Sequence, residues 1–379
     1  MSSLKVAIVG GVSAGLIFLI ITIVSLWYCI SRCRRLSNKN SETGSSEPSA
    51  VVELRTRGLR SSSGASYSCR QFAVEELEQA TKQFNENNLI GFGSFGLVYK
   101  GLLSDGSVVA IKRRSGPPKQ EFVEEVGYFS RIRHRNVVSL LGYCQEGGYQ
   151  MLVTEYLPNG SMCNHLYETE KESTSKLEFR QRLSIAIGAA RGLCHLHTQQ
   201  PPILHGNFRT ANVMVDENFI AKVADAGLPR LLEKIEDAGP SQSSSVNVFR
   251  DPETGHLNIF SEANDVFSFG VFLLELLTGK VAPQADTFES NESILQWLET
   301  HLNSDTLVDH RLVGSFTTEG MQDLLRLTIR CVHFPGRERP TMMVVVSEID
   351  EILEKEIMRT TVVGEGTTIV TLGSQLFTT

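Results

Sequence analysis

A glycine-rich stretch, "IGFGSFGLVYK", carries the first side chains and turns suited to chemistry on phosphates. It places Gly91, Gly93 and Gly96 between two apolar runs. Glycines at this spacing also open helices in dinucleotide-binding folds, but here the letters LVY follow, which is a strand pattern. The stretch therefore predicts two strands joined by a flap of backbone amides that closes over nucleotide phosphates.

A lysine and a choice of carboxylates follow this flap. Lys112 ends the apolar run "VVAIK", which comes after an Asp-Gly hairpin turn, and a lysine there would reach the α- and β-phosphates when held by a carboxylate. The next segment, "KQEFVEEVGYFSRIRH", has apolar residues at helical spacing and offers Glu121, Glu124 and Glu125 as partners. Two further apolar runs, "NVVSLLGYC" and "YQMLVTEYLPNG", predict two more strands. The adenine of a bound nucleotide would then pair with backbone near Glu155 to Leu157.

Several more motifs follow in order. With "IGFGSFGLVYKG" and "VAIK", the motifs "HRNVVSLLGYC", "EYLPNGSM", "DVFSFGVFLLELLTGK" and "RERPTM" resemble a protein kinase domain of the plant receptor-like kinase type, the interleukin-1-receptor-associated-kinase and Pelle-like group. The match covers roughly Phe72 to Lys355. The resemblance implies an α+β, bilobal protein-kinase fold with a small β-rich amino-terminal lobe and a large helical carboxyl-terminal lobe. It also implies that Asp265 and Arg339 anchor the larger lobe.

The resemblance implies roles at numbered positions. Lys112 is expected to pair with Glu125, while Asn212 and Asp225 are expected to hold Mg²⁺. Asn207 and Arg209 fall at positions that are catalytic in the family. The implied ATP site is lined by Ile90, Gly91, Gly93, Gly96, Val98, Ala110, Lys112, Thr154 at the gatekeeper position, Glu155 and Leu157.

The catalytic loop departs from the family pattern. The family reads H-R-D with a lysine two residues later, whereas this chain has Gly206, Asn207 and Arg209 in those places. The aspartate accepts or orients the proton of the substrate hydroxyl, and an amide cannot take that proton at neutral pH. Loss of a positioned base typically lowers the rate by on the order of 10² to 10⁴. The loop therefore predicts slow or absent phosphoryl transfer.

Further departures point the same way. Gly206 replaces an arginine that, in the family, couples an activation-loop phosphate to the catalytic loop. Arg209 keeps the charge of a lysine that contacts the γ-phosphate, but its planar fork alters the geometry. The stretch "DAG" keeps the Asp225 carboxylate for Mg²⁺ and lacks the aromatic ring of D-F-G. In "DPE", at the place of A-P-E, Glu253 remains available to pair with Arg339.

An apolar segment near the amino terminus predicts a membrane anchor. Residues 6–30 contain no charged side chain and as a helix would reach roughly 37 Å, enough to cross a bilayer. A cleaved signal peptide is the alternative, but the run is too long and "SRCRRLS" offers no cleavage site. One lysine precedes the run and several arginines follow it, which predicts a single pass with residues 1–5 outside and the rest cytoplasmic. The resemblance implies the plasma membrane.

Charge divides the remainder. Residues 31–70 hold eight Arg or Lys and three Glu. This composition predicts that the juxtamembrane segment, 31–71, is disordered, either as a tether lying against anionic lipid or as a plain solvated linker. The whole chain has a net charge of −7, which leaves about −13 on residues 71–379 and argues against nucleic acid as a partner. The kinase-like domain is predicted over 72–355. The Thr- and Gly-rich tail, 356–379, is predicted to be disordered.

These features favour a membrane-anchored receptor-like pseudokinase that binds ATP with Mg²⁺. It would act in signalling as a scaffold, an allosteric partner or a phosphorylation substrate of other receptor-like kinases or co-receptors. Two alternatives stay open at this point, namely an active but atypical serine/threonine protein kinase and a structural adaptor for which nucleotide is irrelevant. Retention of Lys112, Glu125, Asn212 and Asp225 favours nucleotide binding, although paired buried charges can also persist without catalysis.

Overall fold

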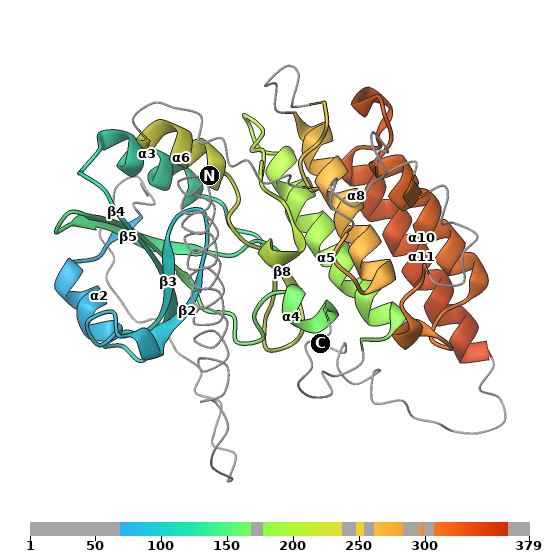
Figure 1. Cartoon of the computed structure of the whole chain (residues 1–379), viewed down its shortest axis with the longest axis horizontal. Coiled ribbons are helices and arrows are strands. Elements are labelled where there is room, and N and C mark those ends of the chain that lie inside the picture. The colour runs from blue at the N-terminus through green and yellow to red at the C-terminus, as the bar shows by residue number, and fades with distance from the viewer. Residues whose placement is uncertain are drawn as a thin grey trace, which may run out of the picture. The chain divides into compact units, whose positions relative to one another are not determined.

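The computed structural model describes residues 69–167, 177–236, 248–253, 261–282, 294, 297–298 and 307–362 (Figure 1). The predicted membrane segment, the basic segment up to residue 68 and the last residues, 363–379, lie outside the described residues. Within the described ranges, no helix combines the length and apolar character needed to span a bilayer.

A six-stranded sheet forms the first part of the domain, with strand order β1-β5-β6-β4-β3-β2. Its strands are β1 (Arg70–Gln71), β2 (Leu89–Phe92), β3 (Leu97–Leu102), β4 (Val108–Ser115), β5 (Leu140–Glu146) and β6 (Tyr149–Glu155). The pair β1 and β5 is parallel and the other pairs are antiparallel. The strands predicted around the glycine-rich turn, the Asp-Gly hairpin and the two later apolar runs are confirmed.

Alternation along β4 gives the sheet two different faces. Val109 and Ile111 are buried in a small core to which helix α2 (Val74–Ala80) also contributes side chains. After α2, the short 3-10 helix η1 (Glu86–Asn88) leads into β2. Successive side chains of a strand point to opposite faces, so Ala110 and Lys112 lie on the other face. Helix α3 (Gln120–Phe129), predicted from its apolar spacing, follows β4.

The second part of the domain is helical. It contains α4 (Cys163–Leu166), α5 (Phe179–His197), α6 (Leu228–Ile235), α8 (Glu262–Thr278), α10 (Thr318–Cys331) and α11 (Met342–Val362). The 3-10 helices are η2 (Thr210–Asn212), η4 (His310–Leu312) and η5 (Gly336–Glu338), and a hairpin pairs β7 (Val213–Val215) with β8 (Ala221–Val223). Helices α5, α8, α10 and α11 lie side by side, with α11 against α5 and α10 against α8 (Figure 1).

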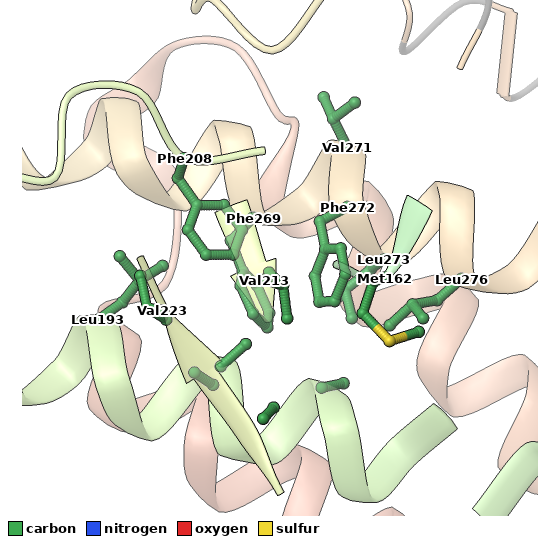
Figure 2. Packing of buried hydrophobic residues seen from close by; sticks show 14 of the residues in the cluster. Met162, Leu193, Phe208, Val213, Val223, Phe269, Val271, Phe272, Leu273 and Leu276 are labelled. Atoms are coloured by element: carbon green, nitrogen blue, oxygen red, sulfur yellow. The ribbon is translucent and has the colours of Figure 1, made fainter. Parts of the chain in front are cut away.

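The aromatic core of the helical part holds the catalytic loop in place. Phe208, in the middle of that loop, is fully buried, and its ring lies 5.7 Å from those of Phe269 and Phe272 on α8 (Figure 2). Truncating a buried phenylalanine to alanine typically costs about 3–5 kcal/mol. The backbone on either side of Phe208 is therefore fixed by packing.

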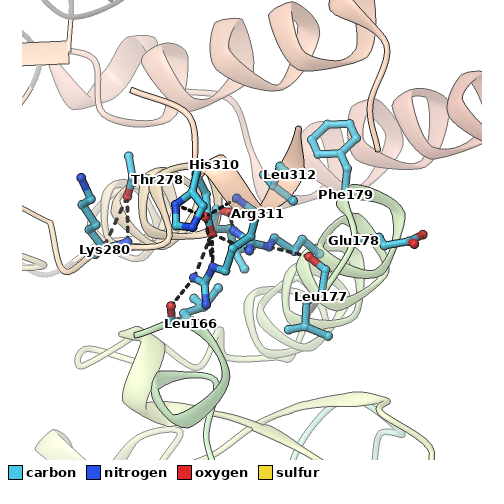
Figure 3. A network of polar contacts seen from close by, with 12 residues as sticks. Leu166, Leu177, Glu178, Phe179, Thr278, Lys280, His310, Arg311 and Leu312 are labelled. Carbon is cyan, nitrogen blue, oxygen red and sulfur yellow. Dashed lines mark hydrogen bonds and ion pairs between the residues drawn. The ribbon is translucent and has the colours of Figure 1, made fainter. Parts of the chain in front are cut away.

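A buried ion network joins the helices beside this core (Figure 3). Arg182 of α5 donates from Nη2 to Asp309 Oδ2 at 2.6 Å and from Nη1 to the Leu276 carbonyl at 2.7 Å. Arg311 of η4 donates from Nε to the same carboxylate at 3.0 Å and also binds the Leu166 carbonyl. Buried charges are stable only when paired in this way, so the network fixes η4 against α5 and α8.

Both predicted domain boundaries need correction. Helix α11 continues to Val362, beyond the end predicted at Lys355. Glu356 is buried, and its carboxylate accepts a hydrogen bond from the Thr317 backbone N–H at 3.2 Å. The prediction that the tail is disordered from residue 356 is therefore wrong for residues 356–362. At the other end, the sheet begins at Arg70, before the predicted start at Phe72.

Candidate nucleotide and catalytic site

The glycine-rich turn joins β2 to β3 and closes on itself. The Gly93 and Gly96 backbones exchange hydrogen bonds of 2.9 and 3.1 Å. Gly96 has φ +143°, and a Cβ there would lie 2.2 Å from the Arg113 carbonyl oxygen, so only glycine fits. Phe95, next to it, is buried and stacks on Phe122 of α3 with ring centroids 6.4 Å apart. The flap is thus packed against α3 through an aromatic ring.

The predicted adenine-binding residues gather on one face of the sheet. Val98 lies opposite Lys112, and Ala110 lies opposite Thr154, so these four side chains share the face turned away from the α2 core. The remaining members lie nearby along the chain, with Ile90 half-exposed in β2, Gly91 after it, and Leu157 buried just after β6.

The side chain of Glu155 forms structural contacts, whereas its backbone is the part expected to pair with adenine. Its Oε1 accepts hydrogen bonds from the Ser139 N–H at 2.7 Å and from Lys222 Nζ at 3.1 Å. Lys222 lies on β8, so this ion pair links the end of β6 to the helical part. Lys222 was not among the predicted site residues, since nothing in its local pattern indicates so distant a partner.

The predicted pair between Lys112 and Glu125 is not formed. Lys112 Nζ instead donates to Asp225 Oδ1, and both side chains are largely buried. Asp225 has φ +65°, a left-handed conformation that is uncommon for a residue other than glycine. The lysine expected at the phosphates and the carboxylate expected at Mg²⁺ therefore neutralise each other.

Glu125 is held by two cations of α6, an arrangement called here the α6 clasp. Lys234 Nζ donates to Glu125 Oε1, and Arg230 Nη2 donates to the same oxygen at 3.2 Å. Arg230 Nε also lies 3.1 Å from Oε2, as an ion pair without hydrogen-bond geometry. Neither cation was among the residues predicted for the site. Their spacing of four residues places them on one face of a helix and was the available signal.

Contacts beside the clasp bring α6 close to α3. Gly227 precedes α6 with φ +73°, and a Cβ there would lie 2.2 Å from the Phe129 ring. Ala226, which replaces the family's aromatic residue, is half-buried against the core. A bulkier residue at 227 would push α6 away from α3, so the glycine is required for the clasp.

The catalytic loop is organised by hydrogen bonds around His205. Its Nε2 donates to the Ala224 carbonyl at 2.9 Å, and its Nδ1 accepts from the Asn207 N–H at 3.3 Å. Burial lowers the pKa of His205, which agrees with a neutral ring carrying its proton on Nε2. Asn212 Nδ2 donates to the Asn207 carbonyl at 2.8 Å, so the base position and the metal position are tied together.

Asp265 anchors the loop as the resemblance implied. Its Oδ2 accepts from the His205 N–H at 2.8 Å and from His197 Nε2 at 2.9 Å, and its Oδ1 accepts from the Gly206 N–H at 2.9 Å. Burial raises the pKa of Asp265, but the hydrogen bond from His197 and the other donors lower it further, so the carboxyl stays ionised. Gly206 has φ +72° and is exposed, a conformation that suits glycine.

The other departures take defined places. The Arg209 guanidinium lies 5.9 Å from the centre of the Phe249 ring, which comes two residues before Asp251 of the "DPE" stretch. The predicted pairing of Glu253 with Arg339 is wrong. Arg339 pairs with Asp251, with Nη2 to Oδ1 at 3.1 Å, while Glu253 accepts from the Gly336 N–H at 3.1 Å. The aspartate at 251, where the family has alanine, supplies the closer carboxylate.

Two residues could bind a metal ion through side-chain oxygens. Asn212 and Asp225 offer one amide oxygen and one carboxylate, a set that suits Mg²⁺ when phosphate oxygens and waters complete its shell. Lys112 occupies Asp225 Oδ1, so these residues fit the ion only after Lys112 withdraws. Among the described residues there is no cluster of three or more His, Cys, Asp or Glu suited to a metal.

Comparison with known proteins agrees with this geometry. Residues 84–349 match the family model described as protein tyrosine and serine/threonine kinase. FERONIA of Arabidopsis thaliana, a receptor-like protein kinase, is 36% identical over 320 residues, covering 82% of this chain and 35% of the relative. ANXUR1 of the same plant, also a receptor-like protein kinase, is 34% identical over 329 residues, covering 83% and 38%. The chain thus spans a little over a third of the length of these relatives.

Among solved structures, the pseudokinase domain of BIR2, an immune regulator of the RLK/Pelle family, is 30% identical with a TM-score of 0.61. The alignment covers 75% of this chain and 86% of that domain. The predicted bilobal fold and the resemblance drawn from the motifs are confirmed.

Proposed function

The chain belongs to the protein kinase family, with plant receptor-like kinases among its relatives, and on that premise we propose that it is a membrane-anchored pseudokinase. Its folded domain acts on a partner receptor-like kinase or co-receptor as a scaffold, an allosteric partner or a substrate. The observation that carries the proposal is Asn207 at the position of the catalytic base. The apolar segment 6–30 serves as the anchor, with the domain on the cytoplasmic side of the plasma membrane.

The rest of the catalytic loop offers no substitute base. Both ring nitrogens of His205 are already engaged, Nε2 with Ala224 and Nδ1 with Asn207. Arg209 is a permanent cation and cannot accept a proton. A substrate hydroxyl placed at this loop would therefore keep its proton as the phosphoryl group approached, which slows transfer by on the order of 10² to 10⁴.

The residues expected to bind phosphate and Mg²⁺ are retained, but Lys112 is paired with Asp225 and Glu125 with α6, which we call the closed arrangement. In an open arrangement, Lys112 would pair with Glu125 and reach the phosphates, and Asp225 with Asn212 would hold Mg²⁺. ATP with Mg²⁺ would supply charge that draws Lys112 and Asp225 apart. Because nucleotide binds the open arrangement alone, its apparent affinity is reduced by the open fraction, and binding shifts the population that a partner meets.

Phosphate transfer by the full chain, purified in detergent with labelled ATP and Mg²⁺ or Mn²⁺, tests this proposal. The Lys112→Met variant, run in parallel, reports any contaminating kinase. We expect no incorporation above that of Lys112→Met from a chain shown to be folded by its thermal transition. Incorporation that disappears in Lys112→Met would instead establish an active, atypical serine/threonine kinase. If the unmodified chain transfers no phosphate, the Asn207→Asp variant shows whether the missing base alone limits the reaction.

A further inference from the structure

Three arginines form an exposed basic segment between α3 and β5. Arg131, Arg133 and Arg135, called here the arginine run, are all exposed. Among the described residues none of them pairs with a carboxylate, and the one hydrogen bond of their guanidinium groups there runs from Arg133 Nη1 to the Ile132 carbonyl at 3.0 Å. The sequence has no Asp or Glu between residues 125 and 146. The run is thus uncompensated positive charge on an acidic domain.

The backbone of the run is fixed. Ile132, between the first two arginines, and Asn136, directly after the third, are buried, and His134 is half-buried, so alternation directs the three guanidinium groups outward. The Val138 N–H donates to the Val223 carbonyl at 2.9 Å, which ties the segment to β8. His134 stacks on His195 of α5 with ring centroids 4.6 Å apart and planes inclined by 13°. The arginine run is therefore a preformed surface on a rigid support.

The chain enters the domain beside this surface. Cys69, at the first described position, packs half-buried against the core, and Arg70 directly after it pairs with Gly142 of β5, the strand that follows the run. The residues before it, 31–70, carry a net charge of about +5, and the apolar segment 6–30 precedes them. Residues 31–68 separate the proposed anchor from the domain, and a stretch of 38 residues reaches at most about 130 Å. The proposed anchor therefore confines the run to the neighbourhood of the bilayer.

We propose that the arginine run is a membrane-docking surface that binds anionic lipid headgroups of the leaflet in which the chain is anchored. This inference rests on the membrane anchor of the proposed function. Guanidinium groups bind phosphate and carboxylate oxygens in pairs, and they are less strongly hydrated than ammonium groups. Each arginine near an anionic surface strengthens binding by about fivefold, so three strengthen it by on the order of a hundredfold. Docking would set the orientation in which the domain meets a neighbouring receptor kinase.

Hydrogen exchange of the full chain in nanodiscs tests the proposal. Nanodiscs of phosphatidylcholine alone are compared with nanodiscs that also contain phosphatidylserine, and exchange is followed for peptides covering residues 130–138. We expect slower exchange of these peptides in the anionic discs. The variant Arg131→Gln/Arg133→Gln/Arg135→Gln is expected to lose that difference. A matched control, Lys82→Gln/Lys280→Gln/Arg337→Gln, removes the same charge from exposed positions elsewhere and is expected to keep it.

Other outcomes overturn the proposal in different ways. Equal exchange in both discs, from a chain that resists alkaline carbonate extraction, removes the docking surface and leaves the anchor standing. A chain that carbonate extracts has no anchor, and the docking proposal falls with it. If the control variant also lost the difference in exchange between the two kinds of disc, binding to lipid would depend on the total charge of the chain and not on the arginine run. If residues 130–138 were protected equally in neutral and anionic discs, and phosphatase treatment removed that protection, phosphorylated serines and not lipid headgroups would be the ligand.

Discussion

Release of the α6 clasp is expected to increase the affinity for nucleotide. The change is Arg230→Gln together with Lys234→Gln, which leaves Glu125 without its two cations. The Glu125 side chain is 5% exposed, so its carboxylate cannot be satisfied by water. Lys112 is then the cation best placed to pair with it, and Asp225 becomes available to a metal ion. The double variant therefore favours the arrangement that binds ATP with Mg²⁺.

The magnitude follows from the exposure of the two cations. Arg230 and Lys234 are 48% and 43% exposed, which limits each contact to the range of partly screened ion pairs, about 0.5–1 kcal/mol. Because both cations make charged hydrogen bonds to a nearly buried carboxylate, we take their combined contribution to the free energy of the closed arrangement as about 2 kcal/mol. A shift of that size changes the ratio of open to closed molecules about 30-fold. The apparent dissociation constant should fall by about the same factor unless the open form already predominates.

The assay is titration of the full chain with a fluorescent ATP analogue in the presence of Mg²⁺. The control is Arg326→Gln together with Lys355→Gln, which removes two partly exposed cations from Asp323 on α10. This control should leave the affinity unchanged. The reasoning is refuted if the clasp variant, with an unaltered thermal transition, binds the analogue no more tightly than the unmodified chain.

Three further predictions concern stability. Gly227→Ala should lower the free energy of unfolding by about 1–3 kcal/mol in urea titrations, since its Cβ would overlap the Phe129 ring and its φ is +73°. Arg182→Met should lower it by about 3–5 kcal/mol in the same assay, because the buried charge of Asp309 loses the more deeply buried of its two arginine partners. The pKa of His205 is lowered by burial, so the unfolded chain binds its proton more readily. This group therefore contributes stability above about pH 6.5 that is lost as the pH falls below that value, a slope that His205→Gln should reduce.

Local patterns were enough to predict the elements around the site. Alternation in β4, the glycine spacing before β3 and the helical spacing in α3 each reflect burial of one face, which a sequence displays directly. The end of the domain was harder to predict. Glu356 and its neighbours read as a polar tail, whereas the pairing of Glu356 with Thr317, distant in sequence, makes that turn of α11 part of the fold.

Ion-pair partners could not be predicted from the family pattern. Lys112 has two acidic candidates, Glu125 and Asp225, and Glu125 has three cationic ones. The choice among them depends on where α6 packs. That packing in turn depends on the close approach of Gly227 to Phe129, which no local pattern reports. The aspartate at 251 displaced Glu253 from Arg339 for a similar reason, since the nearer carboxylate takes the buried cation.

The exchange of partners alters what the retained residues mean. Lys112, Glu125 and Asp225 would persist equally in a domain that binds nucleotide and in one that uses these charges to hold α6 against α3. The two arrangements contain the same charges and differ in which pairs are formed, so their free energies can differ by only a few kcal/mol. A nucleotide, a partner or a membrane surface that prefers one of them by that amount decides which is populated. Restoring a carboxylate at Asn207 supplies the base without moving Lys112 from Asp225. If the domain is the pseudokinase proposed above, phosphoryl transfer would require both a base at position 207 and the exchange of ion-pair partners that nucleotide with Mg²⁺ favours.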